Sequence, residues 1–138
     1  MEENQYVIFK LDNEEYGIDI MNVQEIIRPP KVTSLPCAPP HVLGIINLRG
    51  VIIPIIDLKQ RLGLESSEDT DETRVIVVKV ENHPYGIIVN SVQEVLRLNS
   101  EQIERGDNVY HKIDQSFISG IARLEDRLVI LLKLSADI

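Results

Sequence analysis

An internal repeat constrains the fold of this chain more than any other feature of its sequence. The motif Tyr-Gly-Ile, followed by Val-Gln-Glu, begins at Tyr16 and again at Tyr85, an offset of 69 residues. A second match begins at Gly44 and, 76 residues later, at Gly120. The matched positions keep their order and include glycines and a polar pair, so chance similarity among apolar residues does not account for them. We therefore interpret the chain as two related halves.

Each half shows the apolar runs and polar turns that are typical of short β-strands. The chain has 20 isoleucines and 14 valines against three alanines, which also favours strands, because β-branched side chains lose rotamer freedom in a helix. We expect two hairpins in each half, separated by a short turn and a third strand. Helix is the alternative for that third segment, because Val23, Ile26 and Ile27 also have helical spacing. The expected strands are 6–11, 23–27, 43–48, 51–58, 75–80, 92–96, 118–124 and 128–134, together with runs that begin at Tyr16 and Tyr85.

Five short strands would leave open edges in a flat sheet, whereas closure into a small barrel removes those edges. We therefore predict an all-β single domain, residues 1–138, with a few short helices and two small five-stranded barrels packed together. The approximate barrel boundaries are 6–64 and 73–138, and the repeat leaves open whether the barrels exchange strands. Pro54 cannot donate a ladder hydrogen bond, so its strand is expected at an edge or a bulge.

Two short helical turns have recognisable ends in the sequence. Asp57 is suited to cap a turn that runs through Leu62, and Gly63 is placed to end it. Asn99 and Gln102 have the spacing of a capping box at the start of a second turn. Helix is therefore expected to be a minor component of the fold.

The charge of the chain limits the class of its partners. A net charge of −8, with no cluster of basic residues, argues against nucleic acid. Much of the acidic excess lies in residues 65–72, which we interpret as a solvated loop between the halves. No apolar run approaches the roughly 18 residues of a membrane span, and the N-terminus lacks a signal-peptide pattern. With a single cysteine, Cys37, the chain is expected to be cytoplasmic and free of internal disulfides.

The segment Asn47 to Leu58, which reads NLRGVIIPIIDL, resembles the CheW family of bacterial chemotaxis coupling proteins. The resemblance extends over nearly the whole chain and includes the repeated motif at Tyr16 and the final run Leu128 to Leu131. It implies that the barrels are SH3-like and that the protein is a non-enzymatic adaptor, without cofactors, that couples chemoreceptors to the histidine kinase CheA. The alternative is a paralogous scaffold for another receptor–kinase pathway, such as surface motility.

The same resemblance implies which surfaces and residues contact partners. A groove between the barrels would hold the signalling tip of a chemoreceptor, and separate surfaces would dock the regulatory domain of CheA. The protein is expected to be a monomer until it is recruited to membrane-associated receptor arrays. The positions that match the family's functional motif are Val23, Glu25, Gly44, Arg49 and Gly50, with Val92 and Val95 on the matching element of the second half.

Arg49 is the most informative of these positions, because the second half has Glu125 at the same place in the repeat. Duplication of the fold therefore does not require an arginine. We expect Arg49 to bind a partner carboxylate from a tight turn that Gly50 permits, and an ion pair within the chain is the alternative. A strand would place Val23 and Glu25 on one face suited to docking, and the alternative is that Val23 belongs to the core.

The sequence gives little support to an enzyme or a metal site. It contains no phosphate-binding loop, no nucleophile elbow and no zinc-protease motif. Cys37 and His41 are separated by three residues, but two candidate ligands without a second pair do not predict a zinc site. A binding function is therefore favoured over catalysis.

Overall fold

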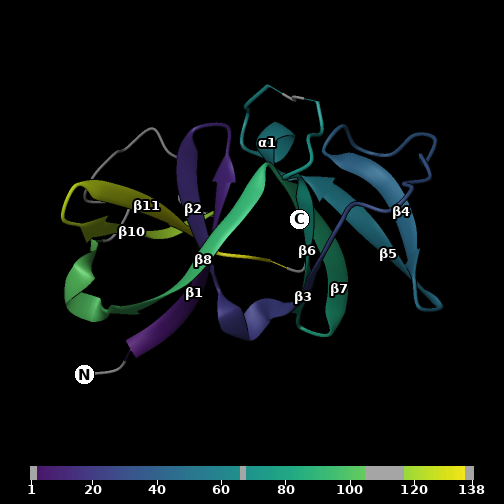
Figure 1. The fold of residues 1–138 in the computed structure, drawn as a ribbon. Helices are drawn as coiled ribbons and strands as arrows, with labels where there is room; N and C mark the ends of the chain where they lie inside the picture. Colours follow the sequence, from purple (N-terminus) through teal and green to yellow (C-terminus); the bar gives the residue numbers. More distant parts are fainter. Residues whose placement is uncertain (1–2, 66–67, 105–116, 136–138) are drawn as a thin grey trace.

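A computed structural model gives the fold of the chain and describes residues 3–65, 68–104 and 117–135 (Figure 1). These residues form eleven strands, one short α-helix and two single-turn 3-10 helices, so the all-β prediction is confirmed. In chain order the elements are β1 (Glu3–Leu11), β2 (Glu14–Asp19), η1 (Ile20–Asn22), β3 (Val23–Ile27), β4 (Val42–Leu48), β5 (Val51–Asp57), α1 (Leu58–Arg61), β6 (Arg74–Val80), β7 (His83–Val89), β8 (Ser91–Asn99), η2 (Ser100–Gln102), β9 (Ile103–Glu104), β10 (Ile118–Leu124) and β11 (Arg127–Leu132).

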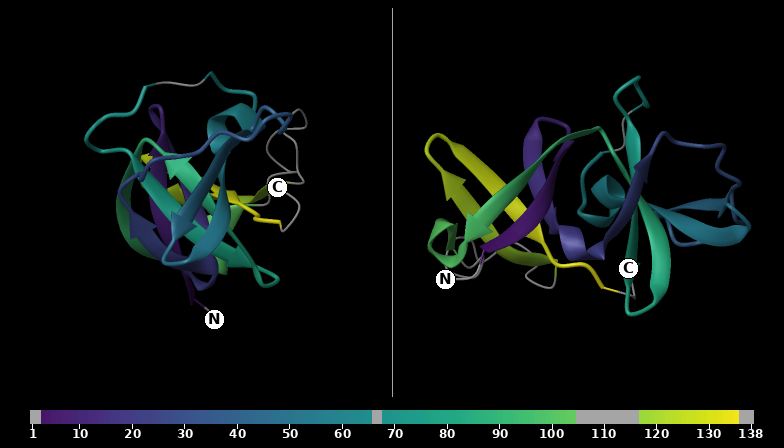
Figure 2. Two further views of the ribbon diagram at one scale, coloured as in Figure 1. Left: turned by 90° about the vertical axis from the view of Figure 1, so that its right-hand side faces the viewer. Right: turned by 60° about the horizontal axis from the view of Figure 1, so that its bottom comes forward.

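The strands form two curved sheets that lie side by side (Figure 2). Barrel A has the strand order β8-β1-β2-β11-β10-β9, and barrel B has the order β3-β6-β7-β5-β4. The predicted architecture of two packed SH3-like barrels is confirmed. Barrel A contains six strands rather than five, because the two-residue strand β9 is added to it. At the matching place in barrel B, Thr33 forms a single bridge with Ile45.

Each barrel combines strands from both halves of the sequence. The first hairpin, β1–β2, pairs through β1 with β8 and through β2 with β11. The hairpin β6–β7 pairs with β3 and β5 in the same antiparallel and parallel pattern. The two halves have thus exchanged their first hairpins, and the sheets do not follow the boundaries 6–64 and 73–138. As a result, barrel B is one stretch of chain, residues 23–89, inserted between β2 and β8 of barrel A.

The ends of the helical turns follow the sequence signals. At the start of α1 the N–H of Gln60 donates to Oδ1 of Asp57 at 3.4 Å, and Gly63 follows the helix with a φ of 82°. Asn99 and Gln102 form the capping box of η2. Within the described part of the chain, no helix is long and apolar enough to cross a membrane.

Pro54 corrects one expectation from the sequence. Its strand, β5, lies between β7 and β4 and is therefore not an edge strand. Nor does the register between β4 and β5 shift at this residue, which pairs with Ile45. The proline is accommodated because pairing of β5 with β7 begins only at Ile55, so the ladder on that side does not need its missing N–H.

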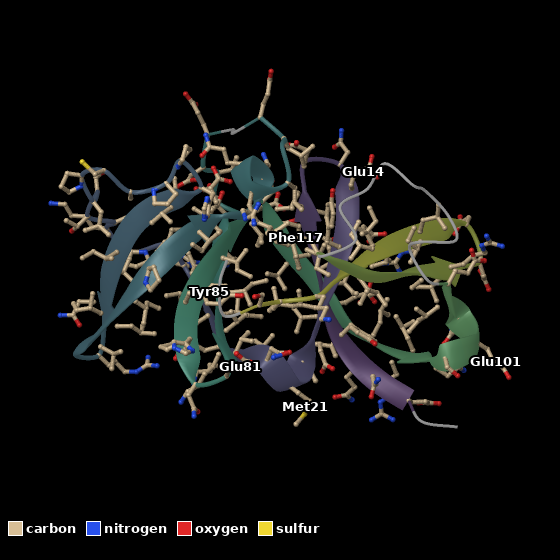
Figure 3. All side chains as sticks on the ribbon, turned by 180° about the vertical axis from the view of Figure 1, so that it is seen from behind. Glu14, Met21, Glu81, Tyr85, Glu101 and Phe117 are labelled. Carbon is tan, nitrogen blue, oxygen red and sulfur yellow. The ribbon has the colours of Figure 1, made fainter. Side chains whose placement is uncertain are left out.

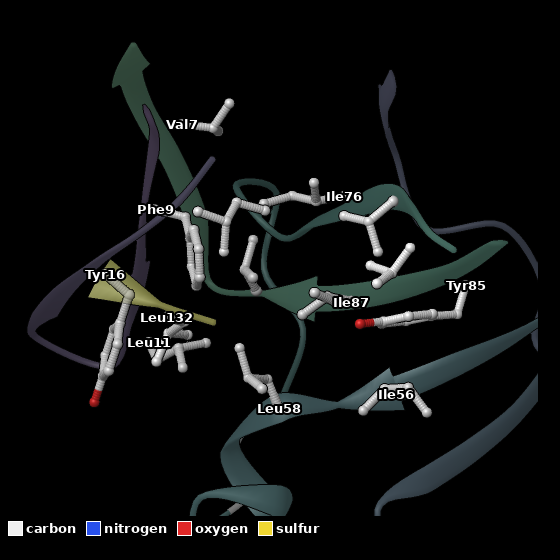
Figure 4. Packing of buried hydrophobic residues seen from close by; sticks show 14 residues of the cluster. Val7, Phe9, Leu11, Tyr16, Ile56, Leu58, Ile76, Tyr85, Ile87 and Leu132 are labelled. Carbon is white, nitrogen blue, oxygen red and sulfur yellow. The ribbon is translucent and has the colours of Figure 1, made fainter. Parts of the chain in front are cut away.

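The largest cluster of buried apolar side chains joins the two barrels (Figure 4). It includes Phe9 and Leu11 of barrel A and Ile76 and Ile87 of barrel B, all with no exposed surface. Two smaller clusters belong to barrel A and barrel B separately. Since burial of one such side chain contributes about 1.5–3 kcal/mol, the shared cluster holds the barrels together as one packed unit.

Candidate protein-interaction site

Arg49 and Gly50 form the two-residue turn between β4 and β5. Both have positive φ, 51° and 87°, which is the geometry that closes a two-residue hairpin with the twist of its strands. The N–H of Gly50 donates to Oδ1 of Asn47 at 2.8 Å and fixes the turn. The side chain of Arg49 is 69% exposed, so the hairpin presents a guanidinium to solvent from a defined backbone.

The structure brings Arg49 together with Glu25 of β3. Nη1 of Arg49 donates to Oε1 of Glu25 at 3.1 Å, and Nη2 donates to Oε2, so the pair is bidentate. The hydrogen bond from Arg49 lowers the pKa of Glu25, and the hydrogen bond to Glu25 raises the pKa of Arg49. The ion pair within the chain, which was the alternative interpretation of Arg49, is therefore present. Because β3 and β4 are the two edges of the sheet, it links the edges of barrel B.

Val23 lies apart from the exposed surface that the sequence suggested for it. β3 alternates between half-buried and exposed side chains, and Val23, Glu25 and Ile27 are the half-buried ones. Val23 packs against the cluster between the barrels, and a β-bulge separates it from Glu25. This packing agrees with the alternative that Val23 belongs to the core. The exposed apolar side chain of β3 is Ile26, which is 41% exposed.

Val92 and Val95 on β8 differ in burial, as Val23 and Ile26 do on β3. Val92 packs against the shared cluster, as Val23 does at the matching place in the repeat. Val95 is 51% exposed, and its counterpart at the 69-residue offset is Ile26. Each barrel therefore has one half-buried valine against the shared core and one exposed apolar residue close to it in sequence.

A second matched pair of exposed apolar residues lies on the hairpins β4–β5 and β10–β11. Ile52 of β5 is 58% exposed and Leu128 of β11 is 62% exposed. They are counterparts at the 76-residue offset. Ile26, Ile52 and Leu128 are not among the site residues predicted from the sequence, although the repeat offsets place each of them in a matched apolar pair.

Gly44 has a structural reason to be glycine. It is buried, its φ is 154°, and a Cβ there would overlap the carbonyl oxygen of Thr33. The close approach lets Thr33 and Ile45 exchange two backbone hydrogen bonds of 2.9 and 2.8 Å. Gly120 of barrel A meets β9 in the same way, with Ile103 as its nearest neighbour. Gly44 therefore shapes the hairpin that carries Arg49 rather than offering a surface of its own.

The matching region of barrel A carries a different ion network. Arg127, at the start of β11, binds Glu15 of β2 through Nε at 3.0 Å and Nη2 at 2.7 Å. Nη2 also lies 3.1 Å from Glu94 of β8, which is the counterpart of Glu25. The hydrogen bond from Arg127 lowers the pKa of Glu15. With side chains 32% and 19% exposed, Arg127 and Glu15 are more enclosed than Arg49.

The described surface includes two hollows. One of about 350 Å³ lies at an end of barrel B between the connection that follows β3 and the acidic segment, and its lining includes Pro30, Leu43 and Asp69. The other, of about 280 Å³, lies where the start of β1 meets η1, next to Met21. Met21 is 86% exposed and projects from the molecule in Figure 3. Neither hollow is lined by the site residues selected from the sequence.

The acidic segment and the isolated cysteine offer no metal site among residues 3–65, 68–104 and 117–135. No group of three or more His, Cys, Asp or Glu side chains in those ranges could hold an ion. Cys37 is exposed, and the described residues of the acidic segment, 65 and 68–72, are exposed as well.

Comparison with known proteins gives one consistent result. A family model described as the CheW-like domain matches residues 5–137. The chain is 39% identical over 127 residues to the chemotaxis protein CheW of Klebsiella aerogenes, covering 92% of this chain and 76% of that protein. It is 34% identical over 130 residues to chemotaxis protein CheW of Bacillus subtilis, covering 94% and 83%. The crystal structure of the scaffolding protein TtCheW from Thermoanaerobacter tengcongensis superposes with a TM-score of 0.89 at 38% identity, covering 96% of this chain and 90% of that one.

Proposed function

Because the chain belongs to the family of CheW-like domains, we propose that it is an adaptor that couples chemoreceptors to the histidine kinase CheA. The family consists of non-catalytic scaffold proteins of chemotaxis, and this protein is accordingly not an enzyme. Its partners would be the cytoplasmic signalling tip of a chemoreceptor and the regulatory domain of CheA. It would act in the cytoplasm, at membrane-associated receptor arrays.

The observation that carries this proposal is the exposed guanidinium of Arg49 on a fixed hairpin turn. Two apolar side chains, Val51 and Ile52, come directly after the turn and are 53% and 58% exposed. An arginine beside apolar surface is the composition that carries much of the binding energy in protein interfaces. A partner carboxylate could take the place of Glu25, since the guanidinium fork binds either carboxylate in the same bidentate geometry.

The remaining site residues support this contact in different ways. Gly50 permits the turn and Gly44 permits the close approach that positions its hairpin. Glu25 orients the guanidinium before a partner arrives. Val95, on barrel A, would contact a partner directly. Val23 and Val92, half-buried against the shared core, would contribute the apolar floor between the barrels.

The proposal is tested by reconstitution with a receptor signalling fragment and CheA. Adding the protein should raise CheA autophosphorylation, and Arg49→Ala should reduce the activation about tenfold or more, because the loss of a central interface arginine commonly costs this much. Arg123→Ala is a matched control, since Arg123 is 66% exposed and pairs with Glu104 at 2.8 Å on barrel A. Its activation should be unchanged.

Two results would contradict the proposal. If the unsubstituted protein bound neither the receptor fragment nor CheA, the adaptor function would be wrong. If Arg49→Ala failed to fold, or folded and activated CheA fully, the ion pair with Glu25 would be a structural contact of barrel B and not part of a docking surface. Circular dichroism of both variants separates these cases.

A further inference from the structure

The second hairpin of each half, β4–β5 or β10–β11, is followed closely by a pair of residues that contact the other barrel. Leu58 and Lys59 follow β5 of barrel B, and Leu134 and Ser135 follow β11 of barrel A. The two pairs are counterparts at the 76-residue offset. Both leucines pack against the cluster that the barrels share. The residue after each leucine makes a polar contact to the opposite barrel, and we call these two contacts the crossing contacts.

The crossing contact of barrel B is an ion pair made by a buried lysine. Lys59 is 5% exposed, and its Nζ lies 2.6 Å from Oδ1 of Asp12 in the β1–β2 turn of barrel A. The backbone N–H of Asp12 donates to Oδ1 of Asn90 at 2.9 Å, and this hydrogen bond fixes the position of Asp12. Asn90 joins β7 of barrel B to β8 of barrel A, and its N–H donates to the carbonyl oxygen of Lys10 at 3.0 Å. The ion pair therefore holds a barrel A turn, a barrel B helix and the connection between them.

The crossing contact of barrel A is a hydrogen bond from a buried tyrosine. The hydroxyl of Tyr85, on β7 of barrel B, donates to the carbonyl oxygen of Ser135 at 3.0 Å. Burial raises the pKa of Tyr85 to about 12, so the hydroxyl keeps its proton at neutral pH. Nearby, the guanidinium of Arg61 on α1 lies 4.3 Å from the ring centre of Phe117, which precedes β10. Figure 3 shows Tyr85 and Phe117 in the middle of the molecule.

Apolar packing and polar contacts differ in how strongly they depend on the relative position of the two barrels. Apolar packing favours burial but has no preferred direction, so an aliphatic interface alone tolerates small sliding or rotation of one layer over another. An ion pair and a hydrogen bond are satisfied in a narrow range of positions. A buried ammonium also loses its hydration, and an apolar side chain of similar size would often serve stability equally well. The lysine is thus better explained by the geometry that it imposes than by the stability that it adds.

We infer that Lys59 is a positioning residue that fixes the angle between the two barrels, with Tyr85 as its weaker counterpart. Arg49 lies on barrel B and Val95 on barrel A, so the angle decides how the two surfaces face their partners. This consequence rests on the proposed adaptor function, whereas the positioning itself does not. The expected defect is a loss of coupling between two partners, with the binding of each partner alone preserved.

The positioning is tested by measuring the distance between the barrels with two spin labels. Labels at the exposed residues Glu101 of barrel A and Lys79 of barrel B, in a Cys37→Ser background, give the distribution of distances by pulsed electron resonance. Lys59→Met keeps an unbranched side chain that is one atom shorter and removes the charge. It should broaden or shift the distribution, and Lys31→Met, at an exposed lysine of the same barrel, should leave it unchanged.

Two further variants keep the test decisive. If Lys59→Met does not fold, Asp12→Asn provides the test, because it removes the partner charge from an exposed turn. It should broaden or shift the distance distribution as well. Tyr85→Phe should have a smaller effect, because it removes one neutral hydrogen bond and keeps the ring. A distribution in folded Lys59→Met or Asp12→Asn that matches the unsubstituted protein would overturn the inference, whatever happens to stability.

The coupling defect is measured with the partners. In Lys59→Met we expect unchanged affinity for the receptor fragment and for CheA separately, and CheA activation in the mixture lowered about fivefold, the lower end of typical coupling between sites. Equal loss of both separate affinities would point to a folding defect and contradict a positioning role. If the unsubstituted protein bound neither partner, the adaptor proposal would fail, and the spin-label result would still decide the role of Lys59.

Discussion

The two barrels have a glutamate at the same position but pair it with an arginine in different ways. Glu25 of barrel B and Glu94 of barrel A are counterparts in the repeat. Glu25 binds Arg49 at the tip of a hairpin, and that side chain is 69% exposed. Glu94 binds Arg127, which is 32% exposed and is also held by Glu15. One barrel presents its guanidinium to solvent, and the other encloses it between two carboxylates.

This difference distinguishes an ion pair that both barrels share from the exposed arginine that only barrel B has at its hairpin turn. In both barrels a glutamate, on β3 or β8, is bound to an arginine of the hairpin β4–β5 or β10–β11, so this contact belongs to the shared architecture. In barrel B the position of Arg127 is taken by Val51 and that of Glu15 by Pro84. The arginine of barrel B has instead the turn position, where Glu25 is its only carboxylate partner among the described residues. We therefore expect loss of Arg127 to affect stability and loss of Arg49 to affect binding.

The largest effect is expected from a feature that both barrels share, the glycine of β4 and of β10. Gly44→Ala should destabilise the protein by about 3 kcal/mol, because the new Cβ overlaps a backbone oxygen of Thr33. Gly120→Ala should cost less, about 1–2 kcal/mol, because its Cβ would lie 2.6 Å from a methyl group of Ile103 and 2.9 Å from the backbone oxygen of Glu104, a smaller overlap with backbone than at Gly44. Denaturant unfolding measures both, and a larger cost for Gly120→Ala would break the comparison.

The next effect concerns the enclosed arginine. Arg127→Ala should lower the free energy of unfolding by about 1 kcal/mol, because it removes three hydrogen bonds and leaves the partly buried Glu15 without its arginine partner. The exposed pair of Arg123 provides the control, and Arg123→Ala should change stability by less. Equal effects of the two substitutions would show that the enclosure of Arg127 has no energetic consequence.

A pH measurement sharpens the same point. The pKa of Glu15 is lowered below its ordinary value of 4.5, chiefly by the hydrogen bond from Arg127. A lowered carboxyl pKa stabilises the folded state above the ordinary value and loses this contribution as pH falls through the folded pKa. The unsubstituted protein should therefore lose more stability between about pH 5 and pH 3 than Arg127→Ala does. Parallel pH curves for the two proteins would contradict the assignment to Glu15.

The smallest effect on stability is expected at the exposed arginine. In Arg49→Ala the midpoint of denaturant unfolding should match that of the unsubstituted chain, because exposed ion pairs contribute little to folding. The same variant is the one expected to lose CheA activation. A clear drop in the midpoint would mean that the two arginines play the same structural role, and the contrast between the barrels would not hold.

Much of the local structure could be predicted from the sequence because it depends on residues a few positions apart. The turn at Arg49 and Gly50 and the caps at Asp57 and Asn99 follow from short spacings. The exchange of hairpins does not. Both first hairpins carry the same motif, so the local pattern is equally compatible with pairing inside a half and pairing between halves, and the choice is made by packing around the shared core.

The candidate site was predictable residue by residue but not as a constellation. Glu25 and Arg49 were selected separately, and nothing in their spacing of 24 positions shows that the edges of a barrel bring them together. The sequence also left open whether Val23 faces a partner or the core, for a related reason. Alternation along β3 shows that two faces exist, but the face that meets the shared cluster is decided by β6 and by the bulge before Glu25.

The insertion of barrel B into barrel A has a consequence for how the chain is made. A ribosome completes all strands of barrel B once Val89 has emerged, whereas β1 and β2 are the first strands produced and their partners β8 and β11 come after barrel B. Since domains generally fold as units during synthesis, we expect barrel B to fold first. The hairpin β1–β2 would then pack against the apolar surface of barrel B before β8 and β11 are available. Barrel A would then be completed against a barrel B that has already folded.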